Sequence, residues 1–341
     1  MSRSRATRTT EAAEGPLIVD FEDNRLLARL FGEHDRHLAR IERRLGVTVS
    51  SRGNRIAIAG PASRRETARA LLVDLYRRLG EGHEVDEGTV EGALRIAEGT
   101  TLEALDEPNG VGDIVVRARR RSVVPRSPNQ GRYLSALQTH DLVFGVGPAG
   151  TGKTYLAVGM AVSMLLEGRV ERIVLARPAV EAGERLGFLP GDMREKIDPY
   201  LRPLFDALHD LLPAEQVARR IDRGEIEIAP LAFMRGRTLG DAFVIVDEAQ
   251  NTTVRQMKML LTRLGEGARM AVTGDPGQVD LPPGERSGLI DAVELLDGTE
   301  GVAVVRFETR DVVRHPMVAR VLDAYAARDR KRRRSDEEGA A

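Results

Sequence analysis

Short apolar runs alternate with amphipathic stretches from residue 129 to residue 330. The runs that indicate strands are LVFGV (142–146), RIVLA (172–176), EIEIA (225–229), FVIVD (243–247), RMAVTG (269–274) and VAVVRF (302–307). Most of them are almost continuously apolar, as expected of parallel strands that helices cover on both faces. The pattern therefore predicts an α/β domain with a mostly parallel sheet over residues 126–330.

A different pattern over residues 16–80 predicts a small α+β domain. A short apolar strand (17–21) precedes two helices, the first at 24–31 and the second ending at Gly46. Two alternating runs, 47–51 and 55–59, indicate a strand pair around Gly53-Asn54, and a long helix follows up to Leu79. The predicted order is βααββα.

Residues 81–125 are predicted to be a connection, rich in glycine and glutamate, around one short helix (89–99). Its end, IVVRARRRSVVPRSP (114–128), is strongly basic, and it either contacts an anionic strand or is an edge strand protected by its charge. Residues 1–15 and 331–341 are expected to be disordered. The tail, KRRRSDEEGAA, is interpreted as a solvated end, with a nucleic-acid contact as the alternative.

Composition narrows the class of protein. The chain has 341 residues, of which 42% are hydrophobic and 30% charged, which is typical of folded soluble proteins. Its net charge of −1 gives no overall basic field for nucleic acid, so such a partner needs a local patch. The absence of cysteine excludes disulfides, thiolate zinc sites and a cysteine nucleophile. With no apolar leader and no apolar run of roughly 20 residues, we expect a cytoplasmic protein without a membrane partner.

The segment GPAGTGKT (147–154) matches the phosphate-loop pattern G-x-x-x-x-G-K-[ST] between an apolar strand and a helix-length run. Its glycines permit a backbone that turns several N–H groups toward one anion. A lysine then reaches the β- and γ-phosphates, and a threonine hydroxyl reaches Mg²⁺. The predicted nucleotide-binding residues are Gly147, Pro148, Ala149, Gly150, Thr151, Gly152, Lys153 and Thr154.

The predicted strand FVIVD ends in an aspartate, Asp247, and a glutamate, Glu248, follows it directly. Asp247 is predicted to hold Mg²⁺ through water together with Thr154, and Glu248 to take the proton from the attacking water. The alternative is that the two acids cap the helix that follows. Further along, Gln278 in GDPGQ is expected to contact the γ-phosphate. The alternative is that this segment is only a turn built from Gly, Asp and Pro.

Upstream of the loop, Gln130 in SPNQGRYLSAL is the candidate reader of adenine, because an amide can bond both a donor and an acceptor on the base edge. The alternative is an ordinary residue at the start of a helix.

Taken together, DEAQ, GDxxQ and the upstream Asn-Gln resemble the ATPase half of superfamily 1 helicases. The segments 129–137, 176–192, 234–251, 273–282 and 307–318 are similar to the PhoH family of ATPases. The resemblance implies one RecA-like core that hydrolyses ATP, with a role in RNA metabolism and in some members an action beside a ribosomal-RNA endoribonuclease. It implies RNA and an endoribonuclease or ribosomal component as partners.

The order βααββα resembles a KH-type RNA-binding domain, whose GxxG loop clamps the nucleic-acid backbone. The corresponding segment, Gly32 to Asp35, lacks the second glycine and places Glu33 and Asp35 where phosphate would approach. A small docking or oligomerisation domain is the alternative reading.

Only one RecA-like domain fits in residues 126–330, so an arginine that stabilises the transition state is expected from a neighbouring subunit of a ring. Arg310 and Arg314 are the candidates, with Arg235 and Arg237 in reserve, and surface ion pairs are the alternative for each. Arg177 is interpreted either as a phosphate contact to nucleic acid or as a subunit contact, as is Arg185. The leading hypothesis is an ATPase that remodels RNA, and the alternative is an ATP-driven switch or scaffold without translocation.

Overall fold

The computed structural model describes residues 15–99, 122–178 and 193–313, together with residues 116, 118, 119 and 328. The chain divides into two compact units, the first comprising Met1–Asp113 with Arg126–Pro128 and the second Ile114–Pro125 with Asn129–Ala341. Of the ends expected to be disordered, all but residue 15 lie outside the described residues.

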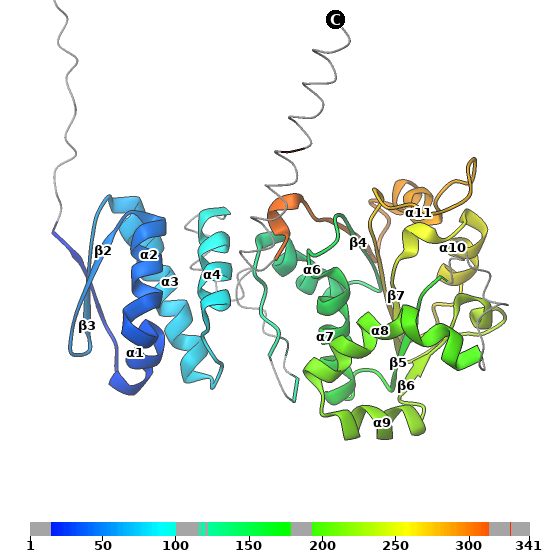
Figure 1. Ribbon diagram of the computed structural model, residues 1–341, viewed down its shortest axis with the longest axis horizontal. Coiled ribbons are helices and arrows are strands. Elements are labelled where there is room, and N and C mark those ends of the chain that lie inside the picture. The colour runs from blue at the N-terminus through cyan, green and yellow to red at the C-terminus, as the bar shows by residue number, and fades with distance from the viewer. Residues whose placement is uncertain are drawn as a thin grey trace, which may run out of the picture. The chain divides into compact units, whose positions relative to one another are not determined.

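The first unit has the predicted order βααββα followed by one more helix. Its elements are β1 (Leu17–Asp20), α1 (Asn24–Phe31), η1 (Glu33–Asp35), α2 (Arg36–Leu45), β2 (Thr48–Arg52), β3 (Arg55–Ala59), α3 (Ala62–Gly80) and α4 (Glu87–Gly99). The three strands form an antiparallel sheet in the order β1-β3-β2. Helices α1, α2 and α3 cover one face of this sheet (Figure 1). Fully buried Leu30, Ile41, Ile58 and Leu72 join sheet and helices in one core.

Helix α4 belongs to the first unit and not to a connection, which corrects the boundary expected at residue 80. Its Val90 and Leu94 are completely buried in the core of that unit. Arg44 of α2 adds a two-pronged hydrogen bond to Glu98. Further along, Arg126 of the basic segment lies so close to Gly92 that a Cβ there would be 2.9 Å from the Arg126 Cα. Residues 114, 115, 117, 120 and 121 of the basic segment lie outside the described residues.

The segment compared with a GxxG loop forms the short 3-10 turn η1. His34 and Asp35 both adopt positive φ angles, 54° and 57°, a conformation that costs most side chains about 1–2 kcal/mol but that Asp tolerates. Asp35 therefore takes the left-handed backbone for which glycine is the usual residue. RNA binding through this turn stays a prediction.

The second unit is an α/β layer structure around a six-stranded sheet. Its elements are α6 (Pro128–Thr139), β4 (Leu142–Val146), α7 (Lys153–Leu166), β5 (Arg172–Ala176), α8 (Met193–Leu211), α9 (Ala214–Asp222), β6 (Ile226–Ile228), η3 (Leu231–Met234), β7 (Ala242–Val246), η4 (Ala249–Asn251), α10 (Val254–Leu261), β8 (Arg269–Gly274), α11 (Gly288–Leu296), β9 (Val302–Arg306) and η5 (Thr309–Asp311). The strand order is β6-β5-β7-β8-β4-β9, and each of these neighbouring pairs is parallel, which confirms the predicted fold class.

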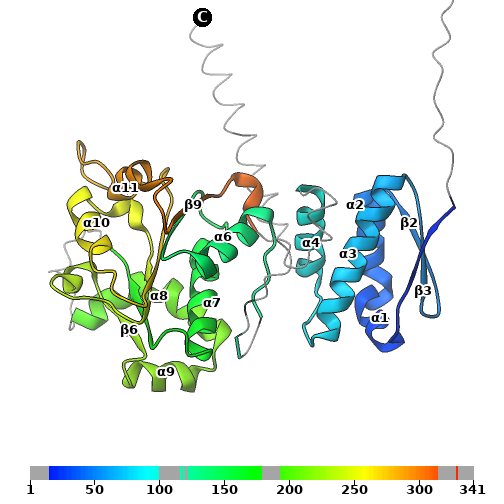
Figure 2. The ribbon, with the colours of Figure 1, turned by 180° about the vertical axis from the view of Figure 1, so that it is seen from behind.

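Helices cover both faces of this sheet (Figure 2). Residues that alternate along one strand enter two separate cores: Val143 packs with α6, α7 and α8, whereas Phe144 packs with α10 and α11. Because both faces are buried, the strands consist of nearly continuous apolar residues. The parallel arrangement places the carboxyl ends of all strands at one edge, where ligands of open α/β sheets bind.

Within the described part of the chain, no helix combines the length and the apolar character needed to cross a membrane.

We predict that Tyr133→Phe leaves the melting temperature unchanged or raises it. The Tyr133 ring packs on Gly145, where a Cβ would lie 2.8 Å from a ring carbon, and its buried hydroxyl has no hydrogen-bond partner. Removing an unsatisfied buried hydroxyl avoids a desolvation cost of about 1–3 kcal/mol. Thermal unfolding measures the effect, with Tyr133→Ala as the control that loses the ring and about 3–5 kcal/mol. A drop of several degrees for Tyr133→Phe would contradict the prediction.

Candidate functional site

The predicted phosphate loop lies between the end of β4 and the start of α7. Gly147, Gly150 and Gly152 have φ angles of 142°, 80° and 84°, which side-chain-bearing residues rarely adopt. At Gly147 a Cβ would also lie 2.4 Å from the carbonyl oxygen of Phe307. The glycine at the first position is therefore required by the close approach of the segment after β9 as well as by its backbone angles.

Contacts from three other segments fix the loop. The Gly147 N–H donates to the Gly274 carbonyl over 3.1 Å, and the Gly150 carbonyl accepts from the Val313 N–H over 3.0 Å. The Gln130 amide donates to the Thr151 carbonyl over 2.9 Å. A loop held at several points keeps its N–H groups oriented before an anion arrives, which is the form of preorganisation that strengthens binding.

The Lys153 ammonium group lies over the same loop. Its Nζ donates to the carbonyl oxygens of Gly147 (2.6 Å) and Pro148 (2.8 Å) and contacts the Thr151 hydroxyl at 3.3 Å. Burial lowers the pKa of Lys153, and the nearby carboxylates, Asp275 first, partly offset this by raising it.

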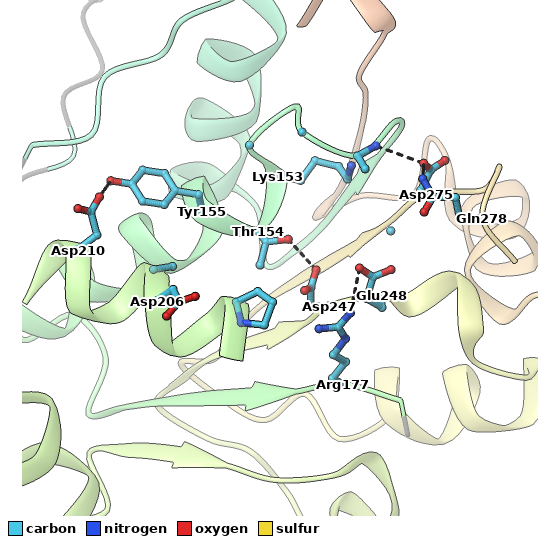
Figure 3. A pocket seen from close by; sticks show the side chains of 16 residues that line it. Lys153, Thr154, Tyr155, Arg177, Asp206, Asp210, Asp247, Glu248, Asp275 and Gln278 are labelled. Atoms are coloured by element: carbon cyan, nitrogen blue, oxygen red, sulfur yellow. Dashed lines mark hydrogen bonds and ion pairs between the residues drawn. The ribbon is translucent and has the colours of Figure 1, made fainter. Parts of the chain in front are cut away.

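Asp247 directly follows β7 and is the centre of a cluster of oxygen atoms. Its Oδ1 accepts a hydrogen bond of 2.7 Å from the Thr154 hydroxyl (Figure 3). The same oxygen accepts a second hydrogen bond, also of 2.7 Å, from the Thr273 hydroxyl. The side chain is almost fully buried. Hydroxyl and carboxylate oxygens are the ligands that Mg²⁺ prefers, and this ion usually takes its remaining ligands from phosphates and water. The adjacent oxygen atoms of Thr154 and Asp247 fit such a shared site.

Glu248 takes a left-handed backbone conformation, with φ 54° and ψ 35°. Each of its carboxylate oxygens has a partner: Oε1 lies 3.2 Å from Nη2 of Arg177, and Oε2 accepts from the Gln250 amide at 2.5 Å. The next helix, α10, is capped by Thr253 in a reciprocal capping box with Gln256. Asp247 and Glu248 therefore do not cap that helix, and the alternative reading of the acidic pair is wrong.

The Gly-Asp turn after β8 closes a further side of the site. The Asp275 Oδ2 accepts from the loop N–H of Ala149 at 3.2 Å and from the Gln278 amide at 2.8 Å. The Asp275 N–H in turn donates to the Gln250 Oε1 at 3.0 Å. This turn therefore links the phosphate loop to Gln250 and hence to Glu248. Sequence reasoning assigned no role to Asp275, Gln250 or Thr273, although Asp275 and Gln250 belong to the motifs GDxxQ and DEAQ.

A cavity of about 680 Å³ joins these groups. The loop, Thr154, the acidic pair and Gln278 line one side, and Pro203, Asp206 and Asp210 of α8 line another. Tyr155 donates its hydroxyl proton to Asp210 at 2.6 Å, so this wall is anchored to the start of α7 (Figure 3). The structure thus gathers Lys153, Thr154, Asp247, Glu248 and Gln278 around one space.

The remaining predicted residues lie elsewhere. Gln130 is buried against the loop and is not among the residues that line the cavity, so its assignment to adenine stays a prediction. Arg310 is 74% exposed and pairs with Glu308. Arg237 forms a two-pronged pair with Glu227, at 2.5 and 2.7 Å, and Arg235 is exposed. Arg314 and Arg185 lie outside the described residues.

A parallel α/β sheet, a phosphate loop between its strand and helix, and a buried aspartate bonded to the loop threonine define a P-loop nucleotide-binding protein. The family model "PhoH-like protein" matches residues 122–326. The chain belongs to this PhoH-like family.

Sequence alignments with members of that family extend over most of the chain. It is 50% identical to a PhoH-like protein of Bacillus subtilis over 87% of this chain and 92% of the relative. It is 48% identical to one from Mycobacterium leprae, over 88% and 86% of the two chains. It is 44% identical to Protein PhoH of Escherichia coli, over 67% of this chain and 66% of that one.

We predict that Arg237→Met destabilises the fold near neutral pH but not in acid. The hydrogen bond from Arg237 lowers the pKa of Glu227, while partial burial raises it. Because the folded-state pKa lies below the ordinary value of 4.5, the pair stabilises the fold above that pH and ceases to do so as pH falls through the folded-state pKa.

The expected loss at pH 7 is about 1 kcal/mol or less, because the pair is partly exposed. Chemical unfolding of both proteins between pH 7 and pH 3 measures it. An equal difference at both ends of that range would show that the charge of Glu227 is not the cause.

Proposed function

We propose that the protein binds ATP with Mg²⁺ and hydrolyses its terminal phosphoanhydride bond. The observation that carries this proposal is the Asp247 carboxylate, which accepts the Thr154 hydroxyl while Glu248 lies next to it on the same cavity. A loop that binds phosphate, a metal ligand pair and a general base are then adjacent.

In this proposal the phosphate loop binds the phosphate groups of ATP. Its N–H groups and the positive end of α7 attract the phosphates. The Lys153 ammonium group exchanges the neutral carbonyl oxygens of Gly147 and Pro148 for charged phosphate oxygens, which form stronger hydrogen bonds. Thr154 and Asp247 would hold the Mg²⁺ ion, which neutralises phosphate charge when bound.

Hydrolysis then requires a base beside the γ-phosphate. Glu248 accepts a proton from a water molecule while the water oxygen forms its bond to phosphorus and the bond to the β-phosphate oxygen breaks. ADP and inorganic phosphate are released. Gln278 of the Gly-Asp turn lines the same cavity, and in this proposal its amide contacts the terminal phosphate.

We further propose that this hydrolysis is coupled to RNA remodelling or to ribosomal-RNA processing. The supporting observations are the helicase-like motifs DEAQ and GDxxQ, the βααββα order of the first unit and the basic stretch at 114–128. An endoribonuclease or ribosomal partner and a ring of identical subunits complete this proposal, with Arg310 or Arg314 of one subunit acting on the next. A switch or scaffold that acts on protein partners alone is the competing reading.

We predict that Glu248→Gln binds Mg·ATP about as well as the unchanged protein but hydrolyses it about 10²–10⁴ times more slowly, because the amide accepts no proton. Lys153→Ala should lose binding itself. Fluorescent nucleotide titration and phosphate release measure the two steps. Hydrolysis by Glu248→Gln at the unchanged rate would exclude this residue as the base.

We predict that structured or single-stranded RNA raises the rate of phosphate release, since the proposed coupling requires RNA to favour the hydrolytic conformation. The measurement is turnover with a panel of RNAs, alongside the oligomer mass in solution. Turnover that no RNA changes would favour the switch or scaffold.

A further inference from the structure

The charges that line the cavity are unbalanced. Five carboxylates face it, whereas Lys153 and Arg177 are the two cationic side chains among the described residues that line it. A triphosphate adds several negative charges to this space. The placement of the second cation therefore matters as much as that of the lysine in the phosphate loop.

Arg177 comes from the strand next to the acidic one. It directly follows β5, whose last residue, Ala176, pairs with Val246 of β7 and accepts the Asp247 N–H at 2.9 Å. The two strands thus place Arg177 beside Asp247 and Glu248. Its side chain is 20% exposed and extends toward Glu248, with Nη2 at 3.2 Å from Oε1 (Figure 3).

The other oxygen of Glu248 has a separate support. Oε2 accepts from the Gln250 amide at 2.5 Å, and Gln250 is itself buried and fixed by the Asp275 N–H. If Arg177 left Glu248, the carboxylate would keep its orientation through Gln250. Only Oε1 would be released, and Oε1 could then accept a proton.

We propose that Arg177 is a catalytic residue for the ATP hydrolysis put forward above, acting within its own subunit. When ATP binds, its guanidinium group turns from Glu248 to the γ-phosphate oxygens. The same movement places a positive charge on the phosphoryl group that is transferred and frees Oε1 to accept the proton of the attacking water. The water oxygen bonds to phosphorus, the bond to ADP breaks, and the proton on Glu248 passes to solvent after phosphate leaves.

The chemistry of arginine suits this exchange. A guanidinium group presents several N–H donors in a rigid plane that matches phosphate oxygens, and it stays charged throughout. Its ion pair with Glu248 joins a side chain that is 37% exposed, and water weakens such an interaction. A phosphate that bears two charges is the stronger acceptor. Arg177 would supply, from the same core, the charge otherwise expected from a neighbouring subunit.

The test compares nucleotides that differ only in the γ-phosphate. For the full-length chain, Arg177→Ala should leave the Kd for Mg·ADP within about twofold. It should weaken binding of a β,γ-imido ATP analogue by about tenfold, the loss expected for a single charge-assisted contact. It should lower kcat by about 10²-fold or more, with a smaller change in KM. Arg177→Lys should recover part of kcat because it keeps the charge.

Arg219→Ala is a matched control, since Arg219 lies on α9, is 66% exposed and pairs with Glu215 away from the cavity. It should change none of these quantities. Mixing Arg177→Ala with Lys153→Ala protein should restore no hydrolysis, because each active site then lacks a group that its own chain must supply.

Several results would overturn the inference. Equal weakening of ADP and of the imido analogue would give Arg177 a structural role only. Faster hydrolysis by Arg177→Ala would make it a restraint on Glu248, and recovery of activity on mixing would place it in a neighbour's site. Failure of the unchanged protein to bind either nucleotide is a different outcome, which contradicts the proposed function itself.

Discussion

The site depends on one carboxylate oxygen that joins three strands. Asp247 directly follows β7, and its Oδ1 accepts a hydrogen bond from the hydroxyl of Thr273 in β8. The same oxygen accepts a second one from Thr154, in the first turn of α7, which the phosphate loop connects to β4. An almost fully buried carboxylate is costly unless such donors compensate for lost water. Because β8 lies between β7 and β4, the contact forms only when all three strands are parallel and in register. The geometry of the site is thus a direct consequence of strand order.

Two other carboxylates of the cavity are also held by partners from neighbouring strand ends or from the loop. Asp275 is bonded to the loop N–H of Ala149 and to Gln278, and Glu248 is held by Arg177 and Gln250. Each of these partners is fixed by a strand end or by the loop, so the charges are positioned before substrate enters. The Gln250 contact keeps Glu248 oriented even if Arg177 moves, and a carboxylate held in this way needs little rearrangement during a reaction. The phosphate loop also contacts the acidic side directly, because the Ala149 N–H donates to Asp275. An anion bound at the loop would therefore interact electrostatically with these carboxylates.

Much of this could be predicted from the sequence because it is encoded locally. Strands buried on both faces have to be apolar, so their positions and the parallel sheet were recognisable, and the phosphate loop needs its glycines at fixed spacing. Asp247 and Glu248 were found because they end such a strand. Helix α4 was assigned to a connection because glycine and glutamate dominate its sequence, while the few apolar residues that bury it, such as Val90 and Leu94, gave only a weak signal.

Pairings between distant residues were not predictable in the same way. Nothing near Arg237 indicates that Glu227 of β6 will bind it, and the chemistry of an amide does not tell whether Gln130 meets a base or the loop carbonyl of Thr151. The position of Arg177 is the most consequential case. A chain with one RecA-like core suggested that a cation must come from a neighbour, yet strand order alone brings the residue after β5 beside the residues after β7. The adjacency of β5 and β7 therefore gives the cavity a second cation from its own chain.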